Sequence, residues 1–418
     1  MGADAFVKLL IFNELDQSQL SLLDLKLDLQ THFDCSISRE AIHKRFTPEA
    51  VAFMKALLAK LIEFRLTAEN AVPSSVKSFN RLCIKDSTKF AIPKEFAETY
   101  PGYGNFNKKG ALMNIQYEYD LLSGNWSCLD FTKATRNDQL DSRETIDNIE
   151  KDDLLLRDLG YVTMPYLIGV VNKGAYFINR LPTTINVYRK KNGKYLPIDW
   201  NSLDRAFKNK GLNQMELNVV LSNKYKLESR MVIVPVPDDV YKERIRKASK
   251  HAKSKGCQLT NKYKIKARYN IFITNVPENR LSLKYIIQIY RLRWQIEIIF
   301  KAWKSSLSIH KAKKVKKERF ECQLIARIIW AVVNWKLYQS ANLALRTIKP
   351  DIGISVLKFF KQATKYLALL RGIIGDSHSM KNWVKEKIIP LLPYLLVETK
   401  KGKTSHCQIL NKNIYGLG

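Results

Sequence analysis

The sequence predicts a mixed α/β fold with helical regions at both ends. Residues 1–70 have apolar side chains at helical spacing, and residues 81–134 alternate in the manner of three successive strands. From about residue 345 onward the pattern is again that of amphipathic helices. At 418 residues the chain is too long for one compact core, so we expect several domains.

The N-terminal helices are predicted by their caps. The segment "SQLSLLDLKLDLQTHF" has a Ser cap, and "SREAIHKRFTPEAVAFMKALLAKLIEFRL" has a second candidate cap at Thr47. Two short helices joined by "DCSIS" could form a helix-turn-helix motif that enters a DNA groove. A small helical bundle without groove contact fits the same pattern. The following "AVPSSVKSFN" has the composition of a linker.

Two aspartates are expected at the ends of strands. The segments "RLCIKDSTKF", "ALMNIQYEYDLLSG" and "NWSCLDFTKA" predict a three-stranded meander, and "LLLRDLGYV" predicts a buried strand stopped by Gly160. Asp86 would then end the first strand and Asp158 the last. Each aspartate alone is also explained as a turn former after a strand.

Strand-like pieces continue in a long insertion between "AYFINRL" (175–181) and "YNIFITNVP" (269–277). They are "TINVYRK", "MELNVVLS" and "SRMVIVPVP", so we expect the insertion to be rich in β-structure. Basic runs follow in "YKERIRKASKHAKSKG", in "NKYKIKAR" and in "HKAKKVKKERF" (310–320). Such runs are commonly solvated faces, but beside a carboxylate cluster they would form a channel for a phosphate backbone.

The charge of the chain indicates an anionic partner. A net charge of +31 and a pI near 9.8 favour nucleic acid or an anionic membrane surface. The longest apolar runs, such as "IIWAVVNW" and "IIPLLPYLLV", fall short of the roughly 20 residues that span a bilayer. The start "MGADAFVKLL" has no signal-peptide pattern. We therefore expect a soluble cytoplasmic protein that binds no membrane.

The six cysteines and six histidines are scattered, with neither zinc-ligand spacing nor a disulfide framework. Carboxylates would have to hold any bound metal, which favours Mg²⁺ or Mn²⁺. A Gly-rich phosphate loop is also absent from the sequence, so nucleotide hydrolysis is not indicated.

One stretch, "YRLRWQIEIIFKAWK" at 290–304, carries polar residues at regular intervals. On a helix, Tyr290, Arg293, Glu297 and Lys304 would share a stripe roughly 60° wide. Arg293 and Glu297 alone could be a surface ion pair worth about 0.2 to 0.5 kcal/mol. Trp294, beside the stripe, is expected in the core.

These four residues, at gaps of two, three and six, resemble the YREK signature of the DDE transposases encoded by bacterial insertion sequences, in the insertion-sequence-four family. "IKDST" and "LLLRDLGYV" resemble the segments that carry this family's catalytic aspartates. The resemblance extends over roughly residues 19–345. It implies a ribonuclease-H-like core interrupted by the β-rich insertion.

The resemblance also implies the roles of individual residues. Asp86, Asp158 and Glu297 would be catalytic and would hold two Mg²⁺ or Mn²⁺ ions. Tyr290, Arg293 and Lys304 would hold phosphates. Tyr269 could stack on a flipped base, although packing on the core explains it more simply. The predicted DNA-binding residues are Tyr290, Arg293, Lys304, Lys301, Lys313, Lys314, Lys316 and Lys317.

The predicted function is transposition. The enzyme would cut double-stranded DNA at terminal inverted repeats and join the 3′-ends to target DNA, by cut and paste, as a homodimer that holds two ends. A nuclease that does not join DNA and an inactive DNA-binding protein derived from a transposase are the alternatives. The predicted domains are 1–78 (helical, DNA-binding), 79–182 (core, first part), 183–278 (insertion), 279–345 (core, second part) and 346–418 (helical, dimerisation).

Overall fold

The computed structural model describes residues 1–13, 19–63, 78–103, 110–348, 352–373 and 376–397. Most of the predicted linker at 71–80, and residues 398–418, lie outside these residues. The chain forms two compact units. The first unit contains residues 1–74, 85–136 and 294–412, and the second contains 75–84, 137–293 and 413–418. The predicted domains divide the chain differently and stay a prediction.

The first unit begins with helices. They are α1 (Ala3–Ile11), α2 (Leu22–Phe33), α3 (Arg39–Lys44) and α4 (Pro48–Glu63). Ser21 and Asp24 form a reciprocal capping box at α2, with hydrogen bonds of 2.7 and 3.2 Å. The hydroxyl of Thr47 accepts a bond from the Ala50 N–H at the start of α4. The predicted helices and caps are confirmed, and the helix-turn-helix role stays a prediction.

Three strands follow in the meander that the sequence predicts. They are β1 (Leu82–Ile92), β2 (Ala111–Asp120) and β3 (Trp126–Lys133), in the order β3-β2-β1, with a 3₁₀ turn η2 (Lys94–Phe96) after β1. The prediction that the first strand ends at Asp86 is wrong. Thr88, Phe90 and Ile92 are buried at every second position, so the alternation that defines the strand continues beyond Asp86.

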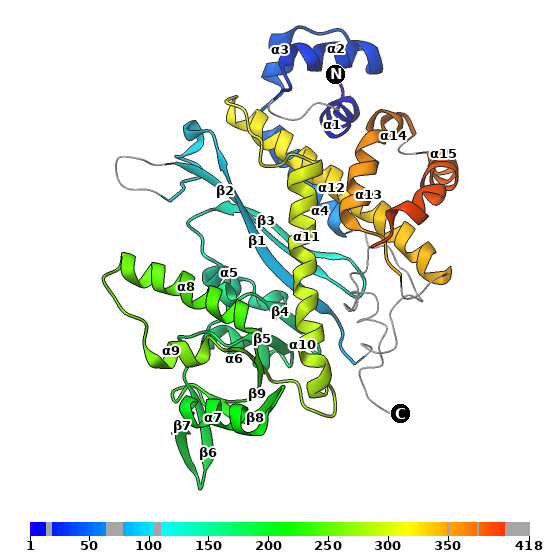
Figure 1. Cartoon of the computed structure of the whole chain (residues 1–418). Helices are drawn as coiled ribbons and strands as arrows, with labels where there is room; N and C mark the ends of the chain where they lie inside the picture. The colour runs from blue at the N-terminus through cyan, green and yellow to red at the C-terminus, as the bar shows by residue number, and fades with distance from the viewer. Residues whose placement is uncertain (14–18, 64–77, 104–109, 349–351, 374–375, 398–418) are drawn as a thin grey trace. The chain divides into compact units, whose positions relative to one another are not determined.

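Helix α11 (Gln295–Ser306) runs across this sheet (Figure 1) and contacts it through aromatic side chains. The Trp303 ring centroid lies 5.0 Å from that of Tyr117 and 5.5 Å from that of Trp126. Phe300, one turn earlier, contacts Tyr117 from the same side of the helix. The aromatic cluster of Tyr117, Trp126, Phe300 and Trp303 therefore fixes the rotation of α11, and with it the direction of its polar side chains.

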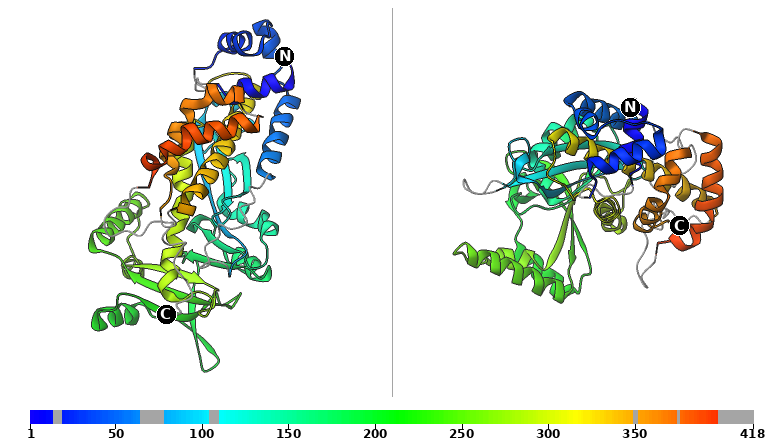
Figure 2. Two further views of the ribbon diagram at one scale, coloured as in Figure 1. Left: turned by 90° about the vertical axis from the view of Figure 1, so that its right-hand side faces the viewer. Right: turned by 90° about the horizontal axis from the view of Figure 1, so that it is seen from above.

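The C-terminal part of the first unit is helical, as predicted. The long α12 (Lys317–Ile348) packs along α4, and α13 (Val356–Ala363), α14 (Leu367–Ile373) and α15 (Ser377–Trp383) lie to one side of it (Figure 2). A 3₁₀ turn η6 (Thr364–Tyr366), a π-turn η7 (Val384–Ile388) and a 3₁₀ segment η8 (Ile389–Leu395) complete the region. Pro390 and Pro393 lack the N–H that α-helical bonding needs, which explains the irregular end.

The second unit contains a parallel strand pair. Strands β4 (Leu154–Arg157) and β5 (Tyr176–Arg180) are connected through α6 (Met164–Asn172), and β4 lies beside the start of β1. Shorter pieces surround them: α5 (Asp138–Glu144), η3 (Ile146–Asn148) and η4 (Leu159–Tyr161). Asp158 follows β4 directly, so the predicted strand end at this aspartate is confirmed.

The insertion adds antiparallel strands to the same unit, in the order β5-β10-β9-β8-β6-β7. They are β6 (Val187–Lys191), β7 (Lys194–Pro197), β8 (Met215–Leu221), β9 (Leu227–Pro235) and β10 (Tyr269–Thr274). The helices between them are α7 (Trp200–Lys210), α8 (Asp238–Ser254) and α9 (Asn261–Lys266), and α10 (Leu283–Arg291) follows β10. The mixed α/β class is confirmed, with more helix in the insertion than the strand pattern predicts.

The core of the second unit contains Tyr269. Tyr269 is buried there, and its hydroxyl donates to the Asp204 carboxylate at 2.7 Å, so packing on the core is confirmed for this residue. No helix among the described residues is long and apolar enough to cross a membrane.

Candidate active site

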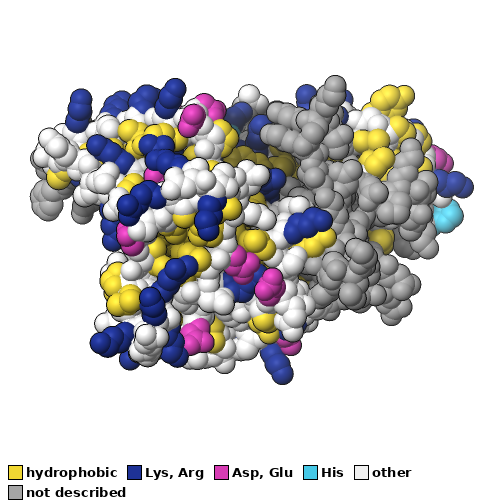
Figure 3. Space-filling view, turned by 60° about the horizontal axis from the view of Figure 1, so that its bottom comes forward, with side chains coloured by type: hydrophobic (Ala, Val, Ile, Leu, Met, Phe, Trp, Pro, Cys, Tyr) yellow, Lys and Arg dark blue, Asp and Glu magenta, His cyan; other side chains and the backbone are white. Residues whose placement is uncertain are grey.

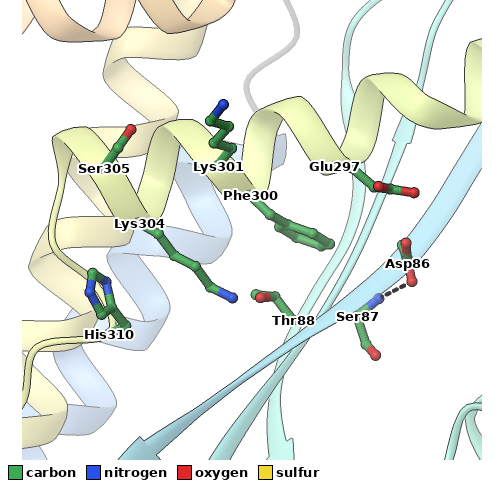
Figure 4. A pocket seen from close by; sticks show the side chains of 9 residues that line it. All are labelled: Asp86, Ser87, Thr88, Glu297, Phe300, Lys301, Lys304, Ser305 and His310. Carbon is green, nitrogen blue, oxygen red and sulfur yellow. Dashed lines mark hydrogen bonds between the residues drawn. The ribbon is translucent and has the colours of Figure 1, made fainter.

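Two of the three predicted carboxylates share a pocket in the first unit. Asp86, from β1, and Glu297, from α11, line a cavity of about 480 Å³. Figure 4 shows their side chains pointing toward one another. Lys304 and His310 lie farther along α11 and just after it, and the Lys304 side chain extends toward Thr88. The pocket therefore has a carboxylate end and a cationic end.

Strand geometry places Asp86 at this pocket. Its neighbour Lys85 is fully buried, whereas Asp86 is half-buried, because successive side chains point to opposite faces of a sheet. The backbone N–H of Ser87 donates to Asp86 Oδ1 at 2.8 Å. This bond limits the rotation of the carboxylate.

Helix geometry places Glu297 at the same pocket. The buried Ile296, Ile299 and Phe300 occupy the side of α11 that faces the core. Glu297 is half-buried and precedes Lys301 and Lys304 by one and two turns, so all three line the pocket. Burial lowers the pKa of Lys304, because removal from water disfavours its charged form.

A second group of predicted residues meets in the second unit. Tyr290 is buried with its ring centroid 5.1 Å from that of Phe272, and its hydroxyl donates to the Arg157 carbonyl at 3.4 Å. Burial, and then the charge of Asp158, raise the pKa of Tyr290 to about 12, while a hydrogen bond from Arg293 opposes this shift. Asp158, Tyr290 and Arg293 are therefore neighbours in this unit.

The stretch 290–304 is not one continuous α-helix. Helix α10 ends at Arg291, a 3₁₀ turn η5 (Leu292–Trp294) follows, and α11 begins at Gln295. A 3₁₀ turn advances by a third of a circle per residue, so it changes the angular positions that an α-helix would give. The expectation that Trp294 lies in the core is wrong, because its side chain is 58% exposed.

The lysines after α11 have mixed environments. Lys314 forms an ion pair with Glu95 at 2.8 Å, and Lys316 donates to the Phe46 carbonyl at 2.6 Å. Lys313 and Lys317 are exposed. Two of these four predicted DNA-binding lysines thus also hold the first unit together.

Sequence reasoning did not identify three polar residues of these sites. Thr88 and His310 line the pocket of the first unit, and Arg180 acts electrostatically on Tyr290 in the second. Arg180 ends β5, which pairs in parallel with β4, so it lies at the same edge as Asp158. The sequence carries no local signal for this placement, because it depends on the parallel pairing of the two strands.

The donor atoms suit a hard divalent cation, since both Asp86 and Glu297 offer carboxylate oxygens to one pocket. Within the ranges that the structure describes, no group of three His, Cys, Asp or Glu side chains lies together as a metal site. Asp158, the remaining predicted ligand, belongs to the second unit.

Sequence comparison decides the family. Residues 77–333 match the model of the transposase DDE domain, which is more than half of the chain. The chain belongs to the DDE transposase family. It is 32% identical over 348 residues to the transposase for insertion sequence element IS231B from Bacillus thuringiensis subsp. berliner, a match that covers 80% of this chain and 72% of the relative.

Other relatives of this DDE transposase family member give similar values. The transposase for IS231D from Bacillus thuringiensis subsp. finitimus is 33% identical. That match covers 74% of this chain and 67% of the relative. The transposase for IS1151 from Clostridium perfringens is 29% identical over 84% of this chain and 76% of its own. The resemblance to the insertion-sequence-four transposases is thereby confirmed, and strands β6 to β10 make the insertion rich in β-structure, as predicted.

A solved structure of the piggyBac transposase synaptic complex with hairpin DNA matches 96% of this chain and 78% of its own, with a TM-score of 0.46 and 11% identity. The family assignment rests on the sequence matches.

Proposed function

We propose that this protein is a transposase that cuts DNA at the ends of an insertion sequence and joins the 3′-ends to target DNA by cut and paste. The observation that carries the proposal is the pocket in which Asp86 and Glu297 face one another beside Lys304. Two carboxylates next to a cation suit a reaction at a phosphodiester, which needs both metal ligands and phosphate-binding groups.

We assign two Mg²⁺ or Mn²⁺ ions to Asp86, Asp158 and Glu297. When bound, these ions would activate a water or a 3′-hydroxyl and stabilise the leaving oxygen of an in-line displacement. The protein's own contribution is to orient the carboxylates. The bond from the Ser87 N–H does this for Asp86, and the packing of α11 does it for Glu297.

The cations would bind the DNA backbone around the reacting phosphate. Lys304 and Lys301 extend the pocket of the first unit with positive charge. In the second unit, the hydrogen bond between Tyr290 and Arg293 would orient the guanidinium toward DNA beside Asp158. Lys313, Lys314, Lys316 and Lys317 would bind more distant phosphates, and the ion pair of Lys314 would exchange for one.

The proposed substrates are double-stranded terminal repeats and target DNA. Joining both ends of an element requires that two ends be held at once, so we propose a homodimer in the DNA complex. As a bacterial DNA enzyme it would act in the cytoplasm. The relatives come from bacteria, which agrees with this setting.

The test is cleavage of a linear DNA that carries the element's terminal repeat, with Mg²⁺, by the wild type and by Glu297→Gln. We expect the wild type to cut at the repeat boundary and the variant to bind but cut about a thousandfold more slowly, because a metal ligand supplies several kcal/mol of transition-state stabilisation.

The matched control is Glu98→Gln, which removes the same charge from an exposed position of the first unit. It should cut like the wild type. If Glu297→Gln cuts as well as Glu98→Gln, Glu297 is not a metal ligand. If the wild type binds the repeat and never cuts it, the protein is an inactive DNA-binding relative.

A further inference from the structure

Helix α8 is a long helix of the second unit that buries none of its residues. Between residues 238 and 268 the chain has eleven Lys and Arg against three Asp and Glu. Apolar burial ordinarily holds a surface helix in place, so a helix without it depends on a few polar contacts. Those contacts show which side of α8 is attached and which side is available.

One side of α8 is attached to β10 and to the two residues that precede it, Ala267 and Arg268. The Arg244 guanidinium donates to the carbonyls of Ala267 and Tyr269 at 3.1 and 3.0 Å, and to Asn270 Oδ1 at 2.6 Å. The Arg268 guanidinium lies 4.5 Å from the centroid of the Tyr241 ring. Tyr241 and Arg244 therefore define the attached side.

The other side of α8 carries a row of cations. At about 100° per residue, Lys242, Arg246, Lys250 and Lys253 fall within an arc of roughly 80°. All four are exposed. We call them the α8 basic row. It extends over about 16 Å, the axial length of roughly five DNA base pairs.

The α8 basic row is only partly compensated within the protein. Glu243 forms ion pairs with Arg246 at 2.7 Å and with Lys247 at 3.3 Å. Lys242, Arg246 and Lys250 are four residues apart, and like charges at that spacing destabilise a helix by a few tenths of a kcal/mol per pair. An extended polyanion would relieve this repulsion along the whole row, whereas a small anion would relieve it at one point.

The attachment also connects α8, through β10 and β5, to the surroundings of two predicted site residues, Tyr290 and Asp158. Asn270 belongs to β10, which pairs with β5 so that Phe272 lies opposite Arg180. Arg180 in turn lies near Tyr290, the neighbour of Asp158. Figure 1 shows α8 and α9 in this unit, and Figure 3 shows that Lys and Arg outnumber Asp and Glu on the face it presents.

We propose that the α8 basic row binds the phosphate backbone of duplex DNA outside the cleaved site, without reading its sequence. The proposal rests on the proposed function, because that reaction is what brings duplex DNA to the second unit. Contacts to phosphates set the position of a protein on DNA and carry no sequence information directly. The row would therefore contribute equally to binding of any duplex that passes it.

The experiment measures the affinity of the full chain for a linear duplex in EDTA, at several salt concentrations, so that no catalysis is required. The variant is Lys242→Gln, Lys250→Gln and Lys253→Gln together. Its control is Lys191→Gln, Lys194→Gln and Lys210→Gln, which removes three exposed lysines elsewhere in the same unit. A third variant replaces Lys242, Lys250 and Lys253 by Arg and tests whether positive charge alone is enough for DNA binding.

In a plot of log affinity against log salt concentration, we expect the slope of the first variant to become shallower by about 0.9 for each phosphate that is no longer neutralised. The control and the Arg variant should keep the wild-type slope. Amide hydrogen exchange in α8 should slow when DNA binds to the wild type. An unchanged slope in the first variant, or an equal change in the control, would overturn the proposal. Both results are independent of DNA cutting, so they separate this inference from the proposed function.

Discussion

At the scale of single residues, the two carboxylates of the pocket are held in different ways. Asp86 lies within a strand that continues beyond it, and Glu297 lies on a helix whose rotation is fixed by the aromatic cluster. Both positions therefore depend on regular structure. A site on regular elements keeps its geometry better than one on loops, which suits a reaction that needs ligands at fixed separation.

A prediction about pH concerns Lys304, whose pKa is lowered by burial. A bound phosphate favours the charged lysine, so its contribution to affinity is complete below the lowered pKa and is lost as the pH rises through it. We expect DNA affinity in EDTA to fall about tenfold as the pH rises through the pKa of Lys304. The lost interaction is one hydrogen bond to a charged group, which is worth about 1.5 kcal/mol.

Lys304→Arg should remove this fall, because a guanidinium stays protonated at alkaline pH. Lys301→Arg, at an exposed position of the same pocket, should leave the fall in place. An alkaline fall that persists in Lys304→Arg would show that another group causes it.

At the scale of elements, the orientation of α11 depends on buried aromatic side chains. Trp303 is fully buried against Tyr117 and Trp126. Trp303→Ala should lower the free energy of unfolding by about 3 to 5 kcal/mol, because it removes buried apolar surface and leaves a cavity. Trp294→Ala, at an exposed Trp nine residues earlier in the chain, should change it by no more than about 0.5 kcal/mol.

Urea denaturation of both variants measures this difference. If Trp303→Ala and Trp294→Ala lower the free energy of unfolding equally, the aromatic cluster does not hold α11 on the sheet. In that case the cluster does not position Glu297 either.

The elements also show what the sequence could predict. The caps at Ser21 and Thr47 and the apolar run before Asp158 are local signals, and the structure confirms them. The end of β1 was predicted wrongly at Asp86, because a polar residue within an alternating pattern resembles a turn residue. Trp294 was also misplaced, because a 3₁₀ turn inside a helical pattern leaves no clear signal in the sequence.

Other features could not be predicted because they depend on the packing of distant segments. Arg180 lies beside Asp158 only because β4 and β5 pair in parallel. Helix α8 could be identified only as a run of charge, since no apolar stripe marks a helix that buries nothing. The residues of the resemblance were identified by their spacing, whereas their neighbours needed the fold.

At the scale of the whole molecule, the charge of +31 makes DNA binding an ion-exchange reaction. Each phosphate neutralised releases counterions, so affinity for any duplex should fall with salt at a log–log slope of about −0.9 per phosphate. Neutralising about six to ten phosphates would lower the affinity by about 10³ to 10⁵ between about 50 and 200 mM salt.

Titration of a labelled duplex at several salt concentrations measures that slope. A shallow slope, equivalent to one or two neutralised phosphates, would contradict the view that the excess of Lys and Arg is there to bind DNA.

We propose that this transposase joins DNA as well as cutting it. The most direct measurement uses DNA ends that are already cut, with a free 3′-hydroxyl, and scores their covalent joining to a supercoiled plasmid in Mg²⁺. We predict joined product with the wild type and with Glu98→Gln, none with Glu297→Gln, and none when the end is a 3′-dideoxynucleotide. If the wild type cuts repeats but joins no 3′-ends, the protein is a nuclease and not a transposase.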